Sequence, residues 1–220
     1  ASIAFGDTAI MLNTISLTRE KKFSSIRHSL EKQPHSRFFY KWLYRLAGQL
    51  VPVHHGINQE LKTLYGIQNR VFAYNGYDLA QIRTDAAAPI EANLGLFLKQ
   101  PVLAHLGRFD TVKCQFQLIK VFHLLRQRIP EIKLLLIGDV DISNQLNYSI
   151  YEFCVQYLKD KGYRVRTIQD DLETVDANCD VVFLGYQSAP HRYLARATAF
   201  AFPSAWEGFP NALVEAMACG

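Results

Sequence analysis

The sequence predicts an α/β protein built on a parallel sheet with helices on both faces. Short apolar runs of strand length recur along residues 101–202, and amphipathic segments of helix length separate them. The runs are apolar at nearly every position, as strands buried on both faces are. Hydrophobic residues make up 49% and charged residues 20% of the 220 residues, which indicates a globular chain and excludes a disordered or coiled-coil one.

Residues 1–90 hold a less regular part of this alternation. Four elements are expected there: a helix over residues 36–48, a strand at 50–55, a helix at 57–65 closed by Gly66, and a strand at 70–74 before a turn at 75–76. Residues 85–93 are rich in Ala with few large apolar side chains, which suits a linker. We therefore place a boundary near residues 80–98 and predict two domains, residues 1–90 and 91–220.

The second domain alternates regularly. Strands are expected at residues 101–106, 132–137, 181–184 and 199–202, and helices at 112–128, 145–161, 190–197 and 211–219. In parallel sheets of this kind, ligands bind at the carboxyl ends of the strands, where loops run into helix N-termini. The functional residues should therefore follow Leu106, Ile137, Leu184 and Phe202.

Charged side chains stand at these strand ends. Arg108 follows the first strand and Lys113 opens the next helix, and together a guanidinium fork and a mobile ammonium suit a diphosphate. After the last strand, Glu207 lies in a loop and Glu215 lies in a helix whose free amides favour a phosphate. Any one of these residues alone would be read as a solvated surface charge. Their convergence on one sheet edge predicts a nucleotide site.

The order and spacing of these motifs resemble the nucleotide-sugar-binding half of retaining glycosyltransferases of family 4 (group 1), which have the GT-B fold. The matching motifs are Gly107-Arg108-Phe109 with Lys113, Leu136-Ile137-Gly138-Asp139, Val182-Phe183-Leu184-Gly185, Pro203-Ser204, and the stretch from Glu207-Gly208-Phe209-Pro210-Asn211 to Glu215-Ala216-Met217-Ala218-Cys219-Gly220. Residues 74–78 resemble the end of that family's acceptor domain more weakly. Cys114 and Val140 depart from the family, which usually has Gly at both positions, and this leaves the donor identity open.

The resemblance implies a Rossmann-like GT-B fold that is incomplete at both ends. Residues 1–90 would be the end of the acceptor domain plus linker, and residues 91–220 a truncated donor domain. The acceptor-side catalytic histidine of the family is expected before Ala1. His54 stands where the family often has Ser, and the resemblance assigns it no role.

The resemblance also implies roles for the matching residues. Arg108 and Lys113 would hold the donor diphosphate and stabilise its developing charge, and Glu207 would contact the transferred sugar, so these three are the catalytic candidates. Glu215 would bind the ribose hydroxyls. The other binding candidates are Gly107, Gly185, Tyr186, Gly208, Phe209, Asn211, Ala212 and Leu213. No cofactor or metal is expected, because the UDP- or GDP-linked sugar is a substrate.

The implied function is transfer of a hexose, with retention, from a nucleotide diphosphate sugar to a glycan or lipid-linked acceptor in surface polysaccharide or glycolipid synthesis. This chain alone is expected to be inactive. Two alternatives stay open. Asp139 and Asp141 form an Asp-x-Asp pair after an apolar strand, the metal-binding signature of GT-A glycosyltransferases. The chain could also be a non-catalytic nucleotide-sugar-binding fragment.

The net charge of +4 is concentrated in one segment of the first domain. Eight cations lie there, opposed only by Glu20 and Glu31: Arg19, Lys21, Lys22, Arg27, Lys32, Arg37, Lys41 and Arg45. Aromatic residues at 38–44 accompany them, which predicts peripheral contact with an anionic membrane unless these rings face the core.

A cytoplasmic location, with that contact at the inner face of the cell membrane, is expected. No apolar stretch approaches the roughly 20 residues of a membrane span. The four cysteines form no C-x-x-C pair. No motif of a nucleic-acid binder accompanies the basic residues.

Overall fold

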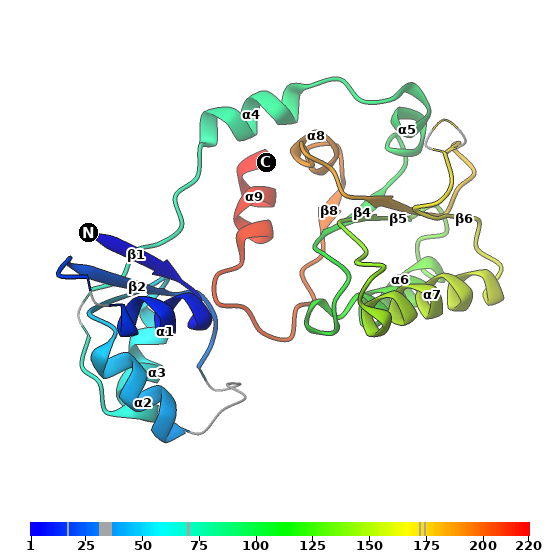
Figure 1. The fold of residues 1–220 in the computed structure, drawn as a ribbon. Coiled ribbons are helices and arrows are strands. Elements are labelled where there is room, and N and C mark those ends of the chain that lie inside the picture. The colour runs from blue at the N-terminus through cyan, green and yellow to red at the C-terminus, as the bar shows by residue number, and fades with distance from the viewer. Residues whose placement is uncertain (17, 31–36, 70, 172, 174) are drawn as a thin grey trace. The chain divides into compact units, whose positions relative to one another are not determined.

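The computed structural model describes residues 1–16, 18–30, 37–69, 71–171, 173 and 175–220 (Figure 1). The chain divides into two compact units. Unit 1 comprises Ala1–Tyr77 with Trp206–Pro210, and unit 2 comprises Asp78–Ala205 with Asn211–Gly220. Among the described residues, no helix has both the length and the apolar character needed to cross a membrane.

Unit 1 contains a parallel sheet of three strands in the order β1-β2-β3. The strands are β1 (Ser2–Phe5), β2 (Lys22–Ile26) and β3 (Gln49–Pro52), and the helices are α1 (Asp7–Ile15), α2 (Arg37–Leu46) and α3 (His55–Tyr65). Parallel neighbours need a crossover connection, and α1 and α2 supply the two crossovers. The core packs Ile10, Ile26, Tyr44, Ile57 and Leu61 together.

The sequence predictions for unit 1 are partly confirmed. The helices over residues 36–48 and 57–65 appear as α2 and α3, although residue 36 lies outside the described residues, and Gly66 closes α3 in the left-handed conformation with φ 66°. His54 caps α3, since its Nδ1 accepts a hydrogen bond from Gly56 N at 2.9 Å.

The predicted strand at residues 70–74 is wrong over its described part, residues 71–74. Ala73 N donates one hydrogen bond to the Pro52 carbonyl at the end of β3, and no ladder follows. Val71, Phe72 and Tyr74 remain largely exposed, so the apolar composition of this segment is not matched by burial. Arg70 lies outside the described residues.

Unit 2 contains a parallel sheet of five strands in the order β6-β7-β5-β4-β8. The strands are β4 (Val102–Leu106), β5 (Lys133–Ile137), β6 (Val165–Arg166), β7 (Val181–Gly185) and β8 (Ala199–Phe200). The helices are α4 (Leu79–Ala87), α5 (Ala92–Phe97), α6 (Gln115–Arg126), α7 (Gln145–Asp160), α8 (His191–Leu194) and α9 (Asn211–Cys219), and a 3₁₀ turn, η1 (Thr111–Lys113), precedes α6.

Both faces of the unit 2 sheet are covered, which confirms the predicted α/β class. Alternate residues of β5 enter two separate cores: Leu134 and Leu136 pack with α6 and α7, whereas Leu135 and Ile137 pack with α5 and α8. Figure 1 shows α6 and α7 side by side along one face. A strand that is buried at every position therefore serves two layers.

The Ala-rich stretch of residues 85–93, which suggested a linker, runs from the end of one helix to the start of the next. Residues up to Ala87 belong to α4, and α5 begins at Ala92. Ala is the strongest helix former, so a low content of large apolar residues does not by itself indicate an irregular segment. Asp78 caps α4 by accepting a hydrogen bond from Gln81 N at 2.9 Å.

A buried ion cluster joins β5 to the segment before β7. Asp180 accepts from Arg126 at 2.5 Å and lies 3.4 Å from Lys133 Nζ, and its other oxygen accepts from Arg164 N at 2.9 Å. Lys133 and Asp180 are both buried. Buried charges persist only when they are paired and hydrogen-bonded, and this cluster meets that requirement.

Candidate functional site

The strand order of unit 2 reverses at β4. Its neighbours are β5, which follows it in the chain, and β8, the last strand. In parallel sheets, the crevice outside the carboxyl ends at such a reversal is where ligands bind. The loops after β4 and β8 meet there, because Ala205 N donates to the Val112 carbonyl at 2.8 Å and Lys113 Nζ lies 6.0 Å from the Phe202 ring centroid.

The loop after β4 is built against the loop after β5. Gly107 N donates to the Ile137 carbonyl at 2.9 Å, and Phe109 N donates to the Asp139 carbonyl at 2.8 Å. Gly138 has φ 146°, and a Cβ there would overlap the Gly107 carbonyl and lie 3.0 Å from Arg108 N. Only glycine fits this conformation and this approach, so the backbone that presents Arg108 rests directly on Gly138.

Arg108 projects from this edge with its side chain 64% exposed, and its Nη2 lies 3.4 Å from Asp110 Oδ2. Asp110 is held in turn, since its other oxygen caps η1 by accepting from Val112 N at 3.0 Å. The structure therefore places the cation of the predicted phosphate site in solvent at the end of β4, on the same edge as Lys113. A guanidinium is more weakly hydrated than an ammonium, so it loses water at a lower cost when it pairs with an anion.

Two buried polar side chains that the sequence did not single out support this loop. Gln115 Nε2 donates to the Arg108 carbonyl at 2.8 Å and lies 3.4 Å from His105 Nε2, while His105 Nδ1 lies 3.0 Å from the Ala201 carbonyl at the end of β8. Both residues are buried. A histidine inside an otherwise apolar strand was the available signal. Ser204 Oγ, on the loop after β8, is buried with no hydrogen-bond partner among the described residues.

The third loop at this edge follows β7. Gly185 ends the strand with φ 70° and its carbonyl accepts from Gly138 N at 2.9 Å. Tyr186 comes next and is exposed. The structure thus brings Gly107, Arg108, Lys113, Gly185 and Tyr186 to the carboxyl ends of the strands.

The remaining predicted residues of unit 2 lie on α9. Asn211, Ala212 and Leu213 form its first turn. Glu215 lies one turn further along, and its Oε2 is 3.7 Å from His191 Nε2. Burial raises the pKa of Glu215, and His191 opposes that rise.

The Glu207-Gly208-Phe209 segment belongs to unit 1. Phe209 packs against the rings of Tyr74 and Tyr77, with centroids 5.8 and 6.4 Å away. A Cβ at Gly208 would lie 2.5 Å from the Arg27 carbonyl carbon and 2.7 Å from His28 Cα. This segment therefore lies close against the backbone that follows β2.

His28 is a titratable group at the carboxyl edge of the unit 1 sheet. Its Nε2 lies 3.3 Å from Asp7 Oδ2, and Asp7 also accepts from the hydroxyls of Tyr40 and Tyr44. Burial pushes the pKa of Asp7 up, but the hydrogen bonds from His28 and the two tyrosines outweigh it, and that pKa is lowered. The hydrogen bond to Asp7 raises the pKa of His28.

Neither a role for His28 nor the strand before it was predicted from the sequence. The reason is that β2 contains two serines, which weaken its apolar pattern. Both are buried, and Ser24 satisfies its hydroxyl by donating to the Ala47 carbonyl at 2.8 Å.

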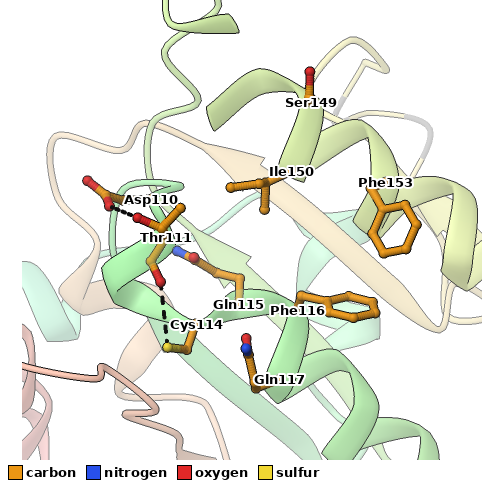
Figure 2. Close-up of a pocket in the computed structure, with 9 residues that line it drawn as sticks. All are labelled: Asp110, Thr111, Cys114, Gln115, Phe116, Gln117, Ser149, Ile150 and Phe153. Atoms are coloured by element: carbon orange, nitrogen blue, oxygen red, sulfur yellow. Dashed lines mark hydrogen bonds between the residues drawn. The ribbon is translucent and has the colours of Figure 1, made fainter. Parts of the chain in front are cut away.

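A pocket of about 370 Å³ lies between the start of α6 and α7 (Figure 2). Apolar side chains form much of its wall: Phe116, Ile150 and Phe153. At its other side Cys114 Sγ donates to the Thr111 carbonyl at 3.6 Å. No side chain among the predicted catalytic or binding residues lines it.

The Asp-x-Asp pair is not part of a larger cluster of potential metal ligands in the described part of the chain. No group of three or more His, Cys, Asp or Glu side chains that could hold a metal occurs there. Asp141 accepts from both the backbone N and the Oγ of Ser143, at 3.0 and 2.6 Å. These hydrogen bonds lower the pKa of Asp141 and show that its carboxylate organises the local turn.

Residues 88–220 match the family model of glycosyl transferases group 1. The match covers more than half of the chain, so the protein belongs to this family of glycosyltransferases. It is 25% identical over 183 residues to an uncharacterized glycosyltransferase of Methanocaldococcus jannaschii, which covers 82% of this chain and 39% of the relative. It is 27% identical over 186 residues to an N-acetylgalactosamine-N,N'-diacetylbacillosaminyl-diphospho-undecaprenol 4-alpha-N-acetylgalactosaminyltransferase of Campylobacter jejuni, covering 84% of this chain and 42% of that protein. The chain thus spans about two fifths of these relatives.

Solved structures show the same fold. HepE of Anabaena, crystallised with UDP and glucose, superposes with a TM-score of 0.74 at 19% identity and covers 99% of this chain and 57% of HepE. TarM superposes with a TM-score of 0.68 at 15% identity, covering 99% of this chain and 39% of TarM. The predicted GT-B type of α/β fold is confirmed, and the GT-A alternative is wrong.

Proposed function

We propose that this chain binds the nucleoside diphosphate part of a UDP- or GDP-linked sugar at the carboxyl edge of the unit 2 sheet. The observation that carries the proposal is the meeting of two loops where the strand order reverses. Arg108 and Lys113 lie on the loop after β4, and the loop after β8 continues towards α9. Two cations at one edge, with a helix N-terminus following the second loop, suit a diphosphate. HepE, which has the same fold, was crystallised with UDP.

The whole reaction is transfer of a hexose, with retention, to a glycan or lipid-linked acceptor. The name of the Campylobacter relative gives an acceptor carried on diphospho-undecaprenol. Arg108 and Lys113 stabilise the charge on the leaving diphosphate, Glu207 contacts the sugar, and Glu215 accepts from the ribose. By itself this chain is expected to bind the donor without completing transfer.

The setting is the synthesis of surface polysaccharide or glycolipid at the cytoplasmic face of a membrane. The exposed side of α2 supports this proposal, because Phe38 is 81% exposed and Trp42 and Leu46 also face solvent. Arg37 and Arg45 flank them. Tyr40, Leu43 and Tyr44 pack inward, so the aromatic residues of α2 divide between the core and the surface. Lys32 and Glu31 of the basic segment lie outside the described residues.

Titration calorimetry with UDP, GDP and the corresponding nucleosides tests the donor site. Arg108→Ala should weaken binding of the nucleoside diphosphate about tenfold or more and leave the nucleoside unchanged, because hydrogen bonds to charged groups contribute roughly 1.5–3 kcal/mol. Arg128→Ala, at an exposed arginine of the same unit, is the matched control. Equal losses for diphosphate and nucleoside, or no binding of either diphosphate by the unmodified chain, would overturn the proposal.

The two glutamates separate nucleotide binding from sugar binding. Glu215→Ala should weaken UDP or GDP itself, whereas Glu207→Ala should leave the nucleotide affinity intact and weaken only the nucleotide sugar. The comparison of UDP with UDP-glucose in each variant measures this. Identical behaviour of the two variants would favour a structural role for both carboxylates.

A further inference from the structure

The side chains of Asp85 on α4, His191 on α8 and Glu215 on α9 lie in a row within unit 2. His191, the first residue of α8, lies between them: its Nδ1 is 3.2 Å from Asp85 Oδ2 on α4, and its Nε2 is 3.7 Å from Glu215 Oε2 on α9. The His191 side chain is only 13% exposed. Gln81 Nε2 donates to the other oxygen of Asp85 at 2.8 Å, so the carboxylate at this end of the line is itself held in place.

The geometry fixes where hydrogens must be. Asp85 is an acceptor, so Nδ1 of His191 carries a hydrogen. Nε2 is then buried, has no hydrogen-bond partner among the described residues, and faces a carboxylate oxygen of Glu215. A neutral ring would oppose a lone pair to an ionised carboxylate, whereas a protonated ring gives an ion pair at both ends.

The other charged groups around His191 are directed elsewhere. From α8, Arg192 bonds to Glu91 and the Pro89 carbonyl, and Arg196 bonds to the carbonyls of Ala86 and Ala88. From α9, the thiol of Cys219 is directed to the backbone, since its Sγ lies 3.8 Å from the His191 carbonyl. Within the described residues, His191 is therefore the basic side chain that the structure places against Glu215.

We propose that His191 is a positioning residue that keeps Glu215 ionised and oriented, so that this carboxylate accepts the ribose hydroxyls of a nucleoside diphosphate. The inference rests on the proposed function. Because Nε2 is buried, the ligand touches Glu215 and not the histidine. An ionised carboxylate is an acceptor only, so the site should prefer a nucleotide that has both ribose hydroxyls. Asp85, which lies 3.2 Å from Nδ1, holds the ring of His191 so that Nε2 faces Glu215.

The proposal also bears on the pKa of Glu215. Its burial raises the pKa of the carboxyl, and the nearby His191 lowers it. Without the histidine, more of Glu215 is protonated at mildly acidic pH, and a protonated carboxyl loses acceptor capacity. Ribose preference in a variant that lacks the cation should therefore fall as the pH falls and recover as it rises.

The test is the affinity ratio of UDP to 2'-deoxy-UDP, or of GDP to 2'-deoxy-GDP if guanosine is the bound base, measured by calorimetry between about pH 5.5 and 8 around the ordinary His pKa. We expect the unmodified chain to prefer the ribose form about tenfold, the value of a hydrogen bond to a charged group. His191→Gln should lose most of this preference at the acidic end and regain it at the alkaline end, with little change for the deoxy form. His123→Gln, at a hydrogen-bonded histidine on α6, is the matched control.

Distinct outcomes overturn distinct claims. Equal losses of ribose and deoxy affinity in His191→Gln, with a lowered melting temperature, would show a merely structural role. An unchanged ratio at every pH would also overturn the inference, as would equal binding of the two forms by the unmodified chain. If the unmodified chain binds neither UDP nor GDP, both the proposed function and this inference are overturned. Asp85→Asn is a second test. It should shift the pH dependence of the ribose-to-deoxyribose affinity ratio in the same direction as His191→Gln.

Discussion

Gly138→Ala should destabilise unit 2 and displace the loop that presents Arg108. Gly138 has φ 146°, which L-residues rarely adopt, and an added Cβ would overlap the Gly107 carbonyl and lie 2.5 Å from its carbon. The three nearest atoms all belong to the backbone, so the overlap cannot be relieved by rotation of a side chain. Conformational strain of about 1–3 kcal/mol adds to about 1–3 kcal/mol of overpacking. The expected loss is therefore about 2–6 kcal/mol.

A matched substitution separates strain from overlap. Gly162 also has a positive φ, 81°, but a Cβ there would meet nothing within 4 Å. Gly162→Ala should therefore cost only the strain, about 1–2 kcal/mol. If Gly138→Ala is no more destabilising than Gly162→Ala, the close approach of the two loops is not a constraint on the fold.

The two units can be followed separately in one urea titration. Both tryptophans, Trp42 and Trp206, belong to unit 1, so their fluorescence reports on that unit. Hydrogen exchange of the β4 and β5 amides reports on unit 2. Gly138→Ala should accelerate exchange in these strands and leave the tryptophan transition in place. It should also weaken UDP or GDP binding, since the Arg108 backbone is displaced. A shift of the tryptophan transition alone would contradict the placement of this strain.

Three further predictions follow from the ion cluster, the His28 pair and the surface of α2. Asp180→Ala leaves Arg126 and Lys133 without their carboxylate and should lower the free energy of unfolding by about 3–5 kcal/mol; a loss below about 1 kcal/mol in urea titration would mean that the cluster is solvated. The raised pKa of His28 stabilises unit 1 fully below the ordinary value of 6.5, and this stability is lost as the pH rises through the higher folded value, so tryptophan-detected stability should fall there and stay level in His28→Gln. Trp42→Ala should reduce sedimentation with anionic vesicles at low salt, whereas Leu96→Ala, at an exposed apolar residue of unit 2, should not; equal binding to neutral vesicles would remove the membrane contact.

Local pattern was sufficient for the elements that are buried throughout. The strand β5 is apolar from Leu134 to Ile137 and buried at every position, so its sequence alone indicates a strand between two layers. Gly66 likewise ended α3 where a left-handed residue was expected. By contrast, β2 hides two buried serines whose partners are known only from the fold, and residues 71–74 have strand composition without a neighbour to pair with.

The residues of the candidate site can likewise be divided into those that the sequence predicts and those that it does not. The strand-end residues Arg108, Lys113 and Gly185 were predictable because a parallel sheet brings the carboxyl ends of its strands to one edge. Their supports were not predictable from the sequence. Gln115 Nε2 lies 3.4 Å from His105 Nε2, and the other ring nitrogen of His105 meets the end of β8. His191 meets Glu215 through the packing of α8 on α9. His105 and Gln115 are 10 residues apart, and His191 and Glu215 are 24 residues apart, so no local periodicity links the members of either pair.

At the carboxyl edge of the unit 2 sheet, the groups that would bind a ligand are different from the groups that stabilise the loop. Arg108 is exposed and forms an ion pair with Asp110 at 3.4 Å, and an exposed ion pair adds at most about 1 kcal/mol to stability. Gln115 is buried and donates to the Arg108 carbonyl at 2.8 Å, so its loss would remove a hydrogen bond that holds the backbone of the loop. Substitution of Arg108 therefore changes the charge offered to a diphosphate while the supporting backbone stays in place. For that reason a loss of nucleotide affinity in Arg108→Ala measures the ligand contact itself, and the same loss in a Gln115 variant would measure the geometry of the loop.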